Sequence, residues 1–111
     1  MKNKVIEILQ YNLKEGTGKK FHKVMRDVSV PLHRAKGIDV VSFGNSLHDS
    51  DCYYLIRAFS SMNDLNSTQS EFYKSDEWLS GPRIEIIEAI GTSIKTIMEL
   101  PEFAIEVLRV K

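Results

Sequence analysis

Hydrophobic and polar positions alternate near the start of the chain, as expected of a half-buried strand. Between residues 5 and 13 one side of this segment is apolar, and the opposite side carries two isoleucines. The segment "EGTG" then ends the strand, and apolar residues recur at helical spacing up to Gly37. We expect the Thr17 hydroxyl to cap this helix. Pro31 should kink the helix or end a first segment near Val30, because proline lacks the amide hydrogen that the helix needs.

The middle of the chain predicts a β-hairpin. "IDVVSFGNSL" and "CYYLIRAFS" are typical of strands, and "HDSD" between them is typical of a turn. The second of these strands is apolar on both sides. One side carries Cys52, Tyr54, Ile56 and Ala58, and the other carries Tyr53, Leu55, Arg57 and Phe59. Both faces of the predicted sheet therefore need apolar neighbours.

The last part of the chain predicts a broken helix and a fourth strand. Ser61 should cap a helix that runs from Met62 to about Tyr73, with the Asp64 carboxylate bonding back to the cap as in a capping box. Ser75 should cap the short turn "DEWL", and Pro82 should open another helix that Gly91 ends. "TSIKTIMEL" then reads as a strand that stops at Pro101. Residues 101–111 form a C-terminal extension, either a short helix or an arm.

This order, β-α-β-β-α-β, predicts an α+β protein with a ferredoxin-like subunit. We expect an antiparallel sheet ordered 4-1-3-2 with helices on one face. The length of 111 residues corresponds to a single domain, residues 1–111. Helices cover only one sheet face although the strands are apolar on both, so the open face requires a partner. The simplest partner is a second copy packed sheet to sheet across a two-fold axis.

Four segments in this order resemble the NIPSNAP family of the dimeric α/β-barrel superfamily. They are "ILQYNLKEGTGKKF", "VPLHRAKGIDVVSFG", "YYLIRAFSSM" and "FYKSDEWLSGPR", the last followed by an Ile-rich helix. The resemblance implies a homodimeric α/β barrel with a pocket between sheet and helices. The molecular function of the family is poorly defined. The wider superfamily includes cofactor-free monooxygenases, haem-degrading enzymes and stress-induced barrels, so fold alone does not identify a reaction.

Composition excludes several classes of function. Lys+Arg and Asp+Glu both number 15, so the formal net charge is zero, which argues against a nucleic-acid-binding protein. No apolar run is long enough to span a membrane, and residues 1–4 do not begin a signal peptide. We therefore expect a cytoplasmic protein. Cys52, the single cysteine, cannot form an internal disulfide and is expected to be an inert core residue.

The three histidines do not predict a metal site. His22, His33 and His48 lack the i,i+4 spacing that places two ligands on one helical face. Haem requires only one axial histidine, and His22 and His33 lie on the predicted first helix beside the pocket. A partly exposed helix histidine is the simpler interpretation for both, so we expect no cofactor and no metal.

Arg57 is the most informative charged residue, because it lies mid-strand among large apolar side chains. A buried arginine must be paired. Glu7 lies midway along the neighbouring first strand, which we expect to run parallel to the strand of Arg57. We therefore predict a Glu7–Arg57 pair inside the barrel. The pair is either a structural ion pair or the polar anchor of a ligand pocket.

The segment "EFYKSDEWLSGPR" is predicted to be a hinge in the second helical region. Trp78 is most simply an apolar plug that joins the broken helix to the first one, and Asp76 and Glu77 suit a first helical turn. In a barrel of this kind the same region borders the pocket, so Tyr73, Trp78 and Arg83 are also candidates for its mouth. The full set of pocket candidates is Glu7, Tyr11, His33, Tyr53, Arg57, Tyr73, Trp78 and Arg83.

Three functions remain open at this point, and whether the protein is an enzyme is among the open questions. The favoured one is a barrel that binds a small apolar or aromatic molecule. The second is a cofactor-free monooxygenase-like enzyme acting on such a metabolite, for which the sequence offers no clear general base apart from histidine. The third is a non-catalytic structural or interaction module. A pocket of roughly 300 Å³ or more would favour the first two, and a filled interior would favour the third.

Overall fold

The structure is a computed structural model that describes residues 2–109, and its central element is a four-stranded antiparallel sheet. The strands are β1 (Asn3–Leu13), β2 (Asp39–Asn45), β3 (Cys52–Phe59) and β4 (Ile90–Pro101). Their order in the sheet is β2-β3-β1-β4. The predicted α+β class and the predicted order, read from the other edge, are confirmed.

The expected parallel pairing of the first and third strands is wrong, because β1 and β3 run antiparallel. The connection through the first helices returns the chain to the end of the sheet where β1 began, so β1 and β2 point the same way. The hairpin then reverses the chain, and β3 opposes both neighbours. The register still places Glu7 directly opposite Arg57, so the predicted contact does not depend on strand direction.

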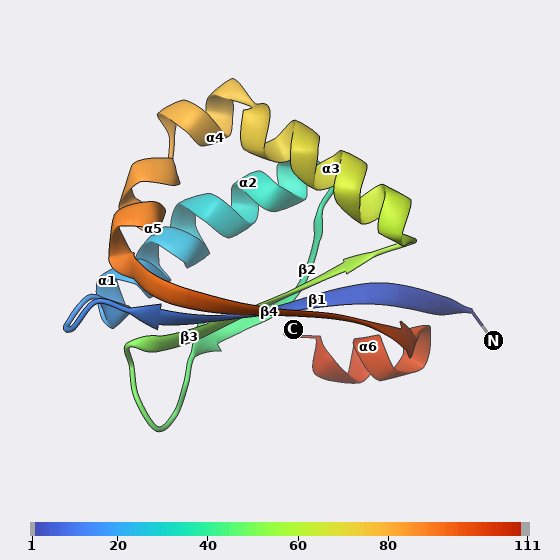
Figure 1. Ribbon diagram of the computed structural model, residues 1–111, viewed down its shortest axis with the longest axis horizontal. Coiled ribbons are helices and arrows are strands. Elements are labelled where there is room, and N and C mark those ends of the chain that lie inside the picture. Colours follow the sequence, from blue (N-terminus) through green and yellow to red (C-terminus); the bar gives the residue numbers. More distant parts are fainter. Residues whose placement is uncertain (1, 110–111) are drawn as a thin grey trace.

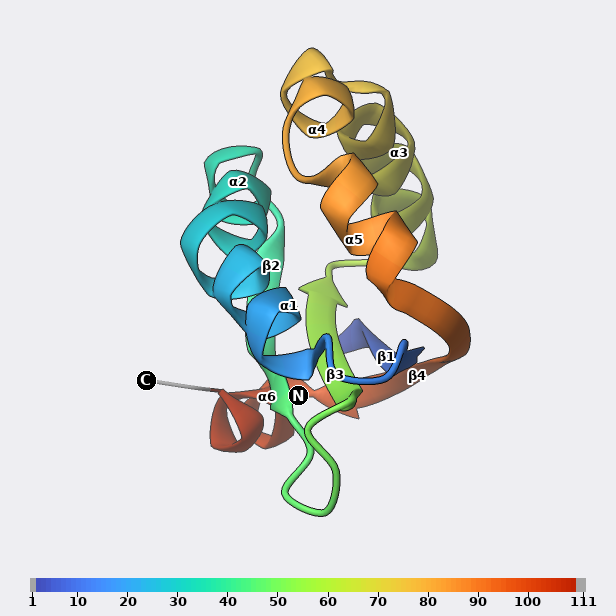
Figure 2. The ribbon, with the colours of Figure 1, turned by 90° about the vertical axis from the view of Figure 1, so that its left-hand side faces the viewer.

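The helices lie in two groups on opposite faces of the sheet. Figure 1 shows α1 to α5 on one side and α6 on the other, and Figure 2 shows the first group as two rows above the strands. The bounds are α1 (Gly18–Val24), the π-helical turn η1 (Met25–Ser29), α2 (Val30–Ala35), α3 (Met62–Lys74), α4 (Asp76–Ser80), α5 (Arg83–Ala89) and α6 (Glu102–Leu108). Part of the predicted extension is therefore a helix, and residues 110–111 lie outside the described range.

Pro31 marks the junction between two segments of the first helical region, as predicted. The turn before it is π-helical, and the amide of Val30 donates to the carbonyl of Met25. A wider turn accommodates a residue that has no amide hydrogen and whose ring clashes with the preceding turn. The predicted Thr17 cap is wrong, because its hydroxyl donates to the carbonyl of Lys14 instead. The Asp51 carboxylate accepts the amides on either side of Thr17.

The caps of the second helical region follow the sequence closely. Ser61 Oγ accepts the amide of Asp64 and so starts α3, and Ser75 Oγ accepts the amide of Trp78 and starts α4. The Asp64 carboxylate bonds to the amide of Ser60, one residue before the predicted partner. The last helix of this group, α5, ends before Gly91, because β4 already begins at Ile90.

Apolar side chains form a core on each face of the sheet. The larger core lies under α1 to α5 and includes Phe21, Leu55, Phe72 and Trp78. The smaller core lies under α6 and joins Ile6, Val41, Ala58 and Ile105. The helix-side core is complete within the chain, whereas α6 covers only one end of the other face.

Candidate functional site

A charged pair lies at the centre of the helix-side core. Arg57 Nε donates to Glu7 Oε1 at 2.8 Å, and Arg57 Nη2 lies 2.5 Å from the same oxygen. Their side chains are 2% and 0% exposed, respectively. The strand register brings both to the middle of the sheet on the helix side, so the predicted pair is present. Such a pair needs further hydrogen bonds to compensate for the water it has lost.

His33 and Tyr73 supply some of these bonds on the arginine side. Arg57 Nη1 donates to His33 Nε2 at 3.0 Å and to the Tyr73 hydroxyl at 2.7 Å. The other ring nitrogen of His33, Nδ1, lies 2.7 Å from the carbonyl of Ser29, which can only accept. His33 is therefore neutral with its proton on Nδ1. Burial, together with the charge of Arg57, lowers the pKa of His33 to about 4.

Two residues that were not predicted from the sequence contact the Glu7 carboxylate. Gln69 Nε2 lies 2.9 Å from each oxygen of Glu7, and Lys95 Nζ lies 3.6 Å from Oε2. Gln69 lies one helical turn before Tyr73, so the i,i+4 spacing on α3 could have indicated it. Lys95 is on β4, and its approach depends on a strand register that its own sequence segment does not reveal.

The Tyr11 hydroxyl lies beside this cluster and reaches solvent. Within residues 2–109, its hydroxyl has no hydrogen-bond partner among the protein atoms. In the same described range, no fully buried side-chain nitrogen or oxygen lacks a partner, so the Tyr11 hydroxyl must reach solvent. Burial, followed by the nearby Tyr73 hydroxyl, raises the pKa of Tyr11 well above its usual value. Tyr11 is therefore a protonated hydrogen-bond donor beside Tyr73, Arg57 and Glu7.

The aromatic hinge predicted from the sequence is present at the start of α4. Trp78 is buried and packs with ring centroids 5.4 Å from Phe72 and 5.1 Å from Tyr73. The Tyr73 ring also lies under the Arg57 guanidinium, at 5.8 Å, and Tyr73 is 37% exposed. Trp78 thus holds Tyr73 in place between the charged cluster and the surface.

Two of the predicted pocket residues make no hydrogen bond to this cluster within residues 2–109, although Tyr53 lies directly across the strands from Tyr11. The Tyr53 hydroxyl lies 2.7 Å from Nδ1 of His22, and its ring packs on Phe21. Arg83 is exposed on α5, and within residues 2–109 it takes part in no hydrogen bond or ion pair. The structure therefore brings together Glu7, Tyr11, His33, Arg57, Tyr73 and Trp78.

The space around the charged cluster is filled by side chains. Arg57, Tyr53 and Trp78 are all buried, and none of three hollows on the surface is lined by Arg57 or Trp78. The largest of the three, about 840 Å³, is lined by open-face residues that include Ile8, Tyr54 and Ile56, and the predicted pocket residues Tyr11 and Tyr53 also line it.

The arrangement suits recognition of a polar group better than removal of a proton. Arg57 makes three hydrogen bonds, to Glu7, His33 and Tyr73, and its Nη2 forms an ion pair with the same Glu7 oxygen. Both nitrogens of His33 are engaged, so this histidine offers no free base. The Tyr11 hydroxyl is the group left to bind an incoming oxygen.

No metal-binding cluster is formed by the described residues: among residues 2–109, no three His, Cys, Asp or Glu side chains converge. Cys52 is half-buried on the open sheet face and not in the core as expected. Burial and the Asp49 carboxylate raise the pKa of its thiol, which makes the thiol less reactive. None of the helices within the same range has the length and apolar character that crossing a bilayer requires.

Known structures with a similar fold include members of the NIPSNAP family. A NIPSNAP family protein of unknown function from Agrobacterium tumefaciens superposes with a TM-score of 0.79 at 24% identity, over 87% of each chain. An uncharacterized NIPSNAP-like domain protein from Burkholderia xenovorans gives 0.78 at 13% identity, over 88% of this chain and 84% of that one. A Nitrosomonas europaea protein, provisionally described as an antibiotic biosynthesis monooxygenase, gives 0.66 at 14%, over 86% and 88%.

These likenesses confirm the resemblance inferred from the four sequence segments. A second structure from Agrobacterium tumefaciens matches at 25% identity over 89% of this chain and 95% of that one, with a TM-score of 0.79. No protein-family model and no curated protein sequence matches the chain. The fold is that of these NIPSNAP proteins, and the Agrobacterium tumefaciens protein is described as having an unknown function, so the likeness identifies no reaction.

Proposed function

We propose that this chain is a binding protein for a small apolar or aromatic molecule that carries a hydroxyl, carbonyl or carboxylate group. The ligand lies between sheet and helices, with its polar group on the Tyr11 hydroxyl and its apolar part against the Tyr73–Trp78 aromatic pair. One observation carries the proposal: beside the buried Glu7–Arg57 pair, the Tyr11 hydroxyl has no hydrogen-bond partner among residues 2–109 and reaches solvent.

The position of Tyr73 supports the same assignment. Its hydroxyl occupies one donor of Arg57 at 2.7 Å, although its side chain is only partly buried. A ligand oxygen that replaces the Tyr73 hydroxyl would keep Arg57 satisfied, so exchange would not leave a buried charge without a partner. A carboxylate or carbonyl oxygen is the best replacement, because a charged or strongly polar acceptor suits guanidinium.

The second candidate is a cofactor-free oxygenase on a similar metabolite, and the likeness to the Nitrosomonas europaea protein favours it. The engaged nitrogens of His33 argue against it, since such chemistry needs a base near the substrate. A third candidate, a structural module, is favoured by the filled interior. Binding without turnover supports our proposal, turnover supports the second candidate, and no binding supports the third.

A thermal-shift screen with aromatic carboxylates, phenols and aryl ketones tests the proposal. At least one class should raise the melting temperature, since a ligand that binds only the folded state stabilises it. Tyr11→Phe should then weaken binding by about tenfold, the value of one hydrogen bond, without changing the stability of the free protein. Tyr54→Phe is the matched control, because the Tyr54 hydroxyl bonds to Ser42 Oγ on the opposite sheet face. An equal loss of ligand affinity in Tyr11→Phe and Tyr54→Phe would contradict the proposed ligand site.

We also propose that the protein is a homodimer whose two copies pack through the open sheet face. Ile94 and Met98 of β4 are exposed there, and Ile8 and Ile56 are only partly covered. A second copy would bury these side chains and shield the unpaired edge of β4. Light scattering at micromolar concentration should give twice the mass of the 12.7 kDa chain. A stable monomer under these conditions would remove the dimer from the proposal and leave the ligand site untouched.

A further inference from the structure

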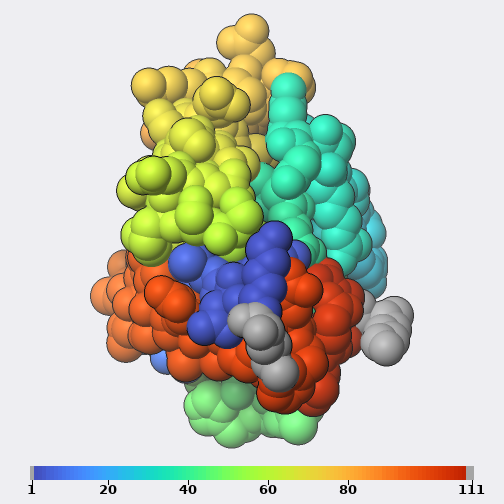
Figure 3. Space-filling view, turned by 90° about the vertical axis from the view of Figure 1, so that its right-hand side faces the viewer, coloured from blue at the N-terminus to red at the C-terminus, as the bar shows by residue number. Residues whose placement is uncertain are grey.

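Strand β4 presents an exposed strip beside the buried charged cluster, on the helix side of the sheet. The register pairs Lys95 with Leu9 and Ile97 with Glu7, so both β4 side chains point to the helix side. Leu9 and Glu7 are buried, whereas Lys95 and Ile97 are exposed. Figure 3 shows β4, in orange, uncovered at the surface below α3, in yellow-green. The helices therefore leave this part of β4 open to solvent.

Lys95 connects the exposed strip to the buried cluster. Its Nζ lies 3.6 Å from Glu7 Oε2, and its side chain is 53% exposed. At this distance the contact is an ion pair and not a hydrogen bond. Among the described residues, 2–109, the Lys95 ammonium donates no hydrogen bond. Its three N–H donors are therefore available to a molecule that arrives from solvent.

The Tyr11 hydroxyl is a second available donor, and the register places Tyr11 near Lys95. Tyr11 pairs with Ser93, and Lys95 follows two residues later on the same side of β4. Diagonal neighbours of this kind are about 7–8 Å apart, a gap that long side chains span. A carboxylate placed between the two side chains can accept from the Lys95 ammonium with one oxygen and from the Tyr11 hydroxyl with the other.

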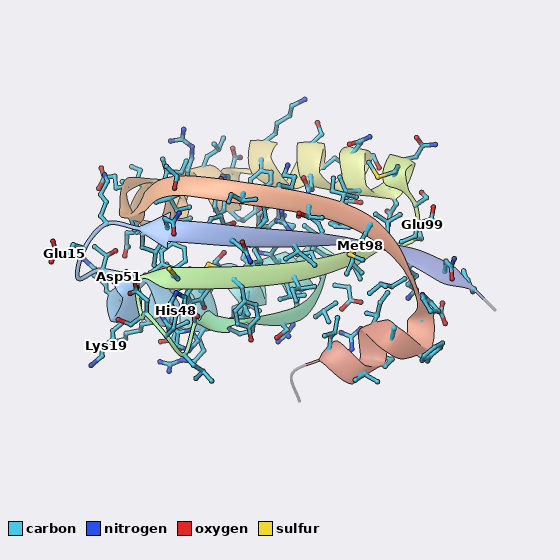
Figure 4. The ribbon with its side chains drawn as sticks, turned by 60° about the horizontal axis from the view of Figure 1, so that its bottom comes forward. Glu15, Lys19, His48, Asp51, Met98 and Glu99 are labelled. Carbon is cyan, nitrogen blue, oxygen red and sulfur yellow. The ribbon has the colours of Figure 1, made fainter. Side chains whose placement is uncertain are left out.

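The charges around these donors favour an anion. Within residues 2–109, Glu7 is the only carboxylate within ion-pair distance of Arg57 or Lys95, and His33 is neutral, so two positive charges share one negative charge. Figure 4 shows Glu99, the acidic residue of β4, near the end of the strand that leads into α6. Glu99 lies four positions beyond Lys95, about 13 Å along the strand, and salt screens charges at that distance.

We propose that the ligand of this site is an aromatic or apolar monocarboxylate, and that Lys95 selects it by its charge. The ligand carboxylate lies between the Lys95 ammonium and the Tyr11 hydroxyl, with the apolar part of the ligand toward Ile97 and the Tyr73 ring. The inference rests on the proposed function and narrows its ligand from three polar groups to one. A neutral hydroxyl or carbonyl would bond to Tyr11 but leave the excess positive charge without a partner.

Matched pairs of aromatic carboxylates and their primary amides test the selection by charge. Benzoate, cinnamate and naphthoate are compared with benzamide, cinnamamide and naphthamide, because the members of each pair differ in charge but hardly in shape. Titration calorimetry of the wild-type chain should give about tenfold higher affinity for the carboxylate of a pair, since hydrogen bonds to charged groups are the stronger ones. Added salt should weaken binding of the carboxylate and leave binding of the amide unchanged.

Substitutions of Lys95 test whether this residue is the source of the preference. Lys95→Met should lose about tenfold in affinity for the carboxylate and none for the amide, whereas Lys95→Arg should keep most of the carboxylate affinity. Lys19→Met is the matched control, because it removes the same charge from an exposed position on α1. Figure 4 shows Lys19 near the β2–β3 turn, at the opposite end of the molecule from Glu99. Circular dichroism checks that all three variants fold.

The outcomes separate selection by charge from binding itself. If neither carboxylates nor amides bind the wild-type chain, the proposed function and this inference are both overturned. If amides bind as tightly as carboxylates, the binding function stands and selection by charge is overturned. If Lys95→Met and Lys19→Met lose carboxylate affinity equally, the effect is one of net charge and the role of Lys95 is overturned. A carboxylate preference that Lys95→Met removes and Lys95→Arg restores supports the inference.

Discussion

The two faces of the sheet differ in what the chain provides for them. On the helix side, the buried Glu7 and Arg57 are hydrogen-bonded to each other, and an aromatic cluster packs over them. On the open side, α6 covers one end, and isoleucine and methionine side chains of β4 remain exposed. The charged cluster on the helix side is thus buried within one copy, and its substitutions should change stability. The open face is incomplete, and its substitutions should change association.

The largest effect is expected from Arg57→Met. Glu7 would stay buried with only Gln69 and Lys95 as partners, and loss of one member of a buried pair costs about 3–5 kcal/mol. Urea unfolding at pH 7 and fixed protein concentration measures this loss. A loss under about 1 kcal/mol would mean that the helix-side face does not depend on the pair.

The double variant Glu7→Gln/Arg57→Met sharpens this prediction. Part of the lost stability should return, because neither charge remains buried alone. The same variant separates two roles of the arginine. Ligand binding that survives in it marks a structural pair. Binding that is lost despite restored stability marks Arg57 as the anchor of the ligand.

The next largest effect is the pH dependence of the free energy of unfolding that arises from His33, on the helix side of the sheet. Its pKa is about 4 in the folded protein, below the ordinary 6.5. As the pH falls from 6.5 to 4, the unfolded chain takes up a proton that the folded protein resists. The free energy of unfolding should therefore fall by up to about 3 kcal/mol over this range, with no further loss from His33 at lower pH.

Urea titrations between pH 4 and pH 7 check this slope. His33→Gln should flatten it, whereas His48→Gln should leave it unchanged, because His48 is exposed in the β2–β3 turn. An equal slope in the His33 variant would show that other groups, and not this buried histidine, determine the acid sensitivity of the helix-side face.

A smaller effect, of a different kind, is expected on the open face. Ile94→Lys places a charge on an exposed position of β4, so the fold should be retained. The dimer dissociation constant should rise about tenfold or more, the cost of about 1.4 kcal/mol at an interface position. Ile84→Lys on α5 is the control. A change in unfolding free energy without a change in association would contradict the contrast between the two faces.

The smallest effect is expected from Arg109→Gln, which loosens α6 from the open face. The pair with Asp39 has two bonds but is partly exposed, with side chains 26% and 37% accessible. We therefore expect a loss of about 1 kcal/mol or less in the free energy of unfolding. Faster hydrogen exchange confined to the amides of α6 would show that the pair positions this helix.

Much of this architecture could be predicted from local sequence patterns. The element order, the break of the first helical region at Pro31 and the Ser61 and Ser75 caps follow from interactions within a few residues, and the sheet order followed from the element order. Glu7 and Arg57 could be paired because a mid-strand charge among apolar neighbours must have a partner, and adjacent strands offered one. The failed Thr17 cap shows the limit, because Asp51, 33 residues from Gly18, takes the amides next to it.

The tertiary structure alone decided which groups share a site. Spacing placed His33 and Tyr73 on helices, but the packing of α2 and α3 over β3 determined that both meet Arg57. It also directed the Tyr53 hydroxyl to His22, placed Arg83 on the surface, and brought in Gln69 and Lys95. The sequence by itself determined the elements and the apolar character of both sheet faces, because period and capping act over short distances. The contacts of the site join residues as far apart in the sequence as Glu7 and Lys95, and only the packed chain brings such segments together.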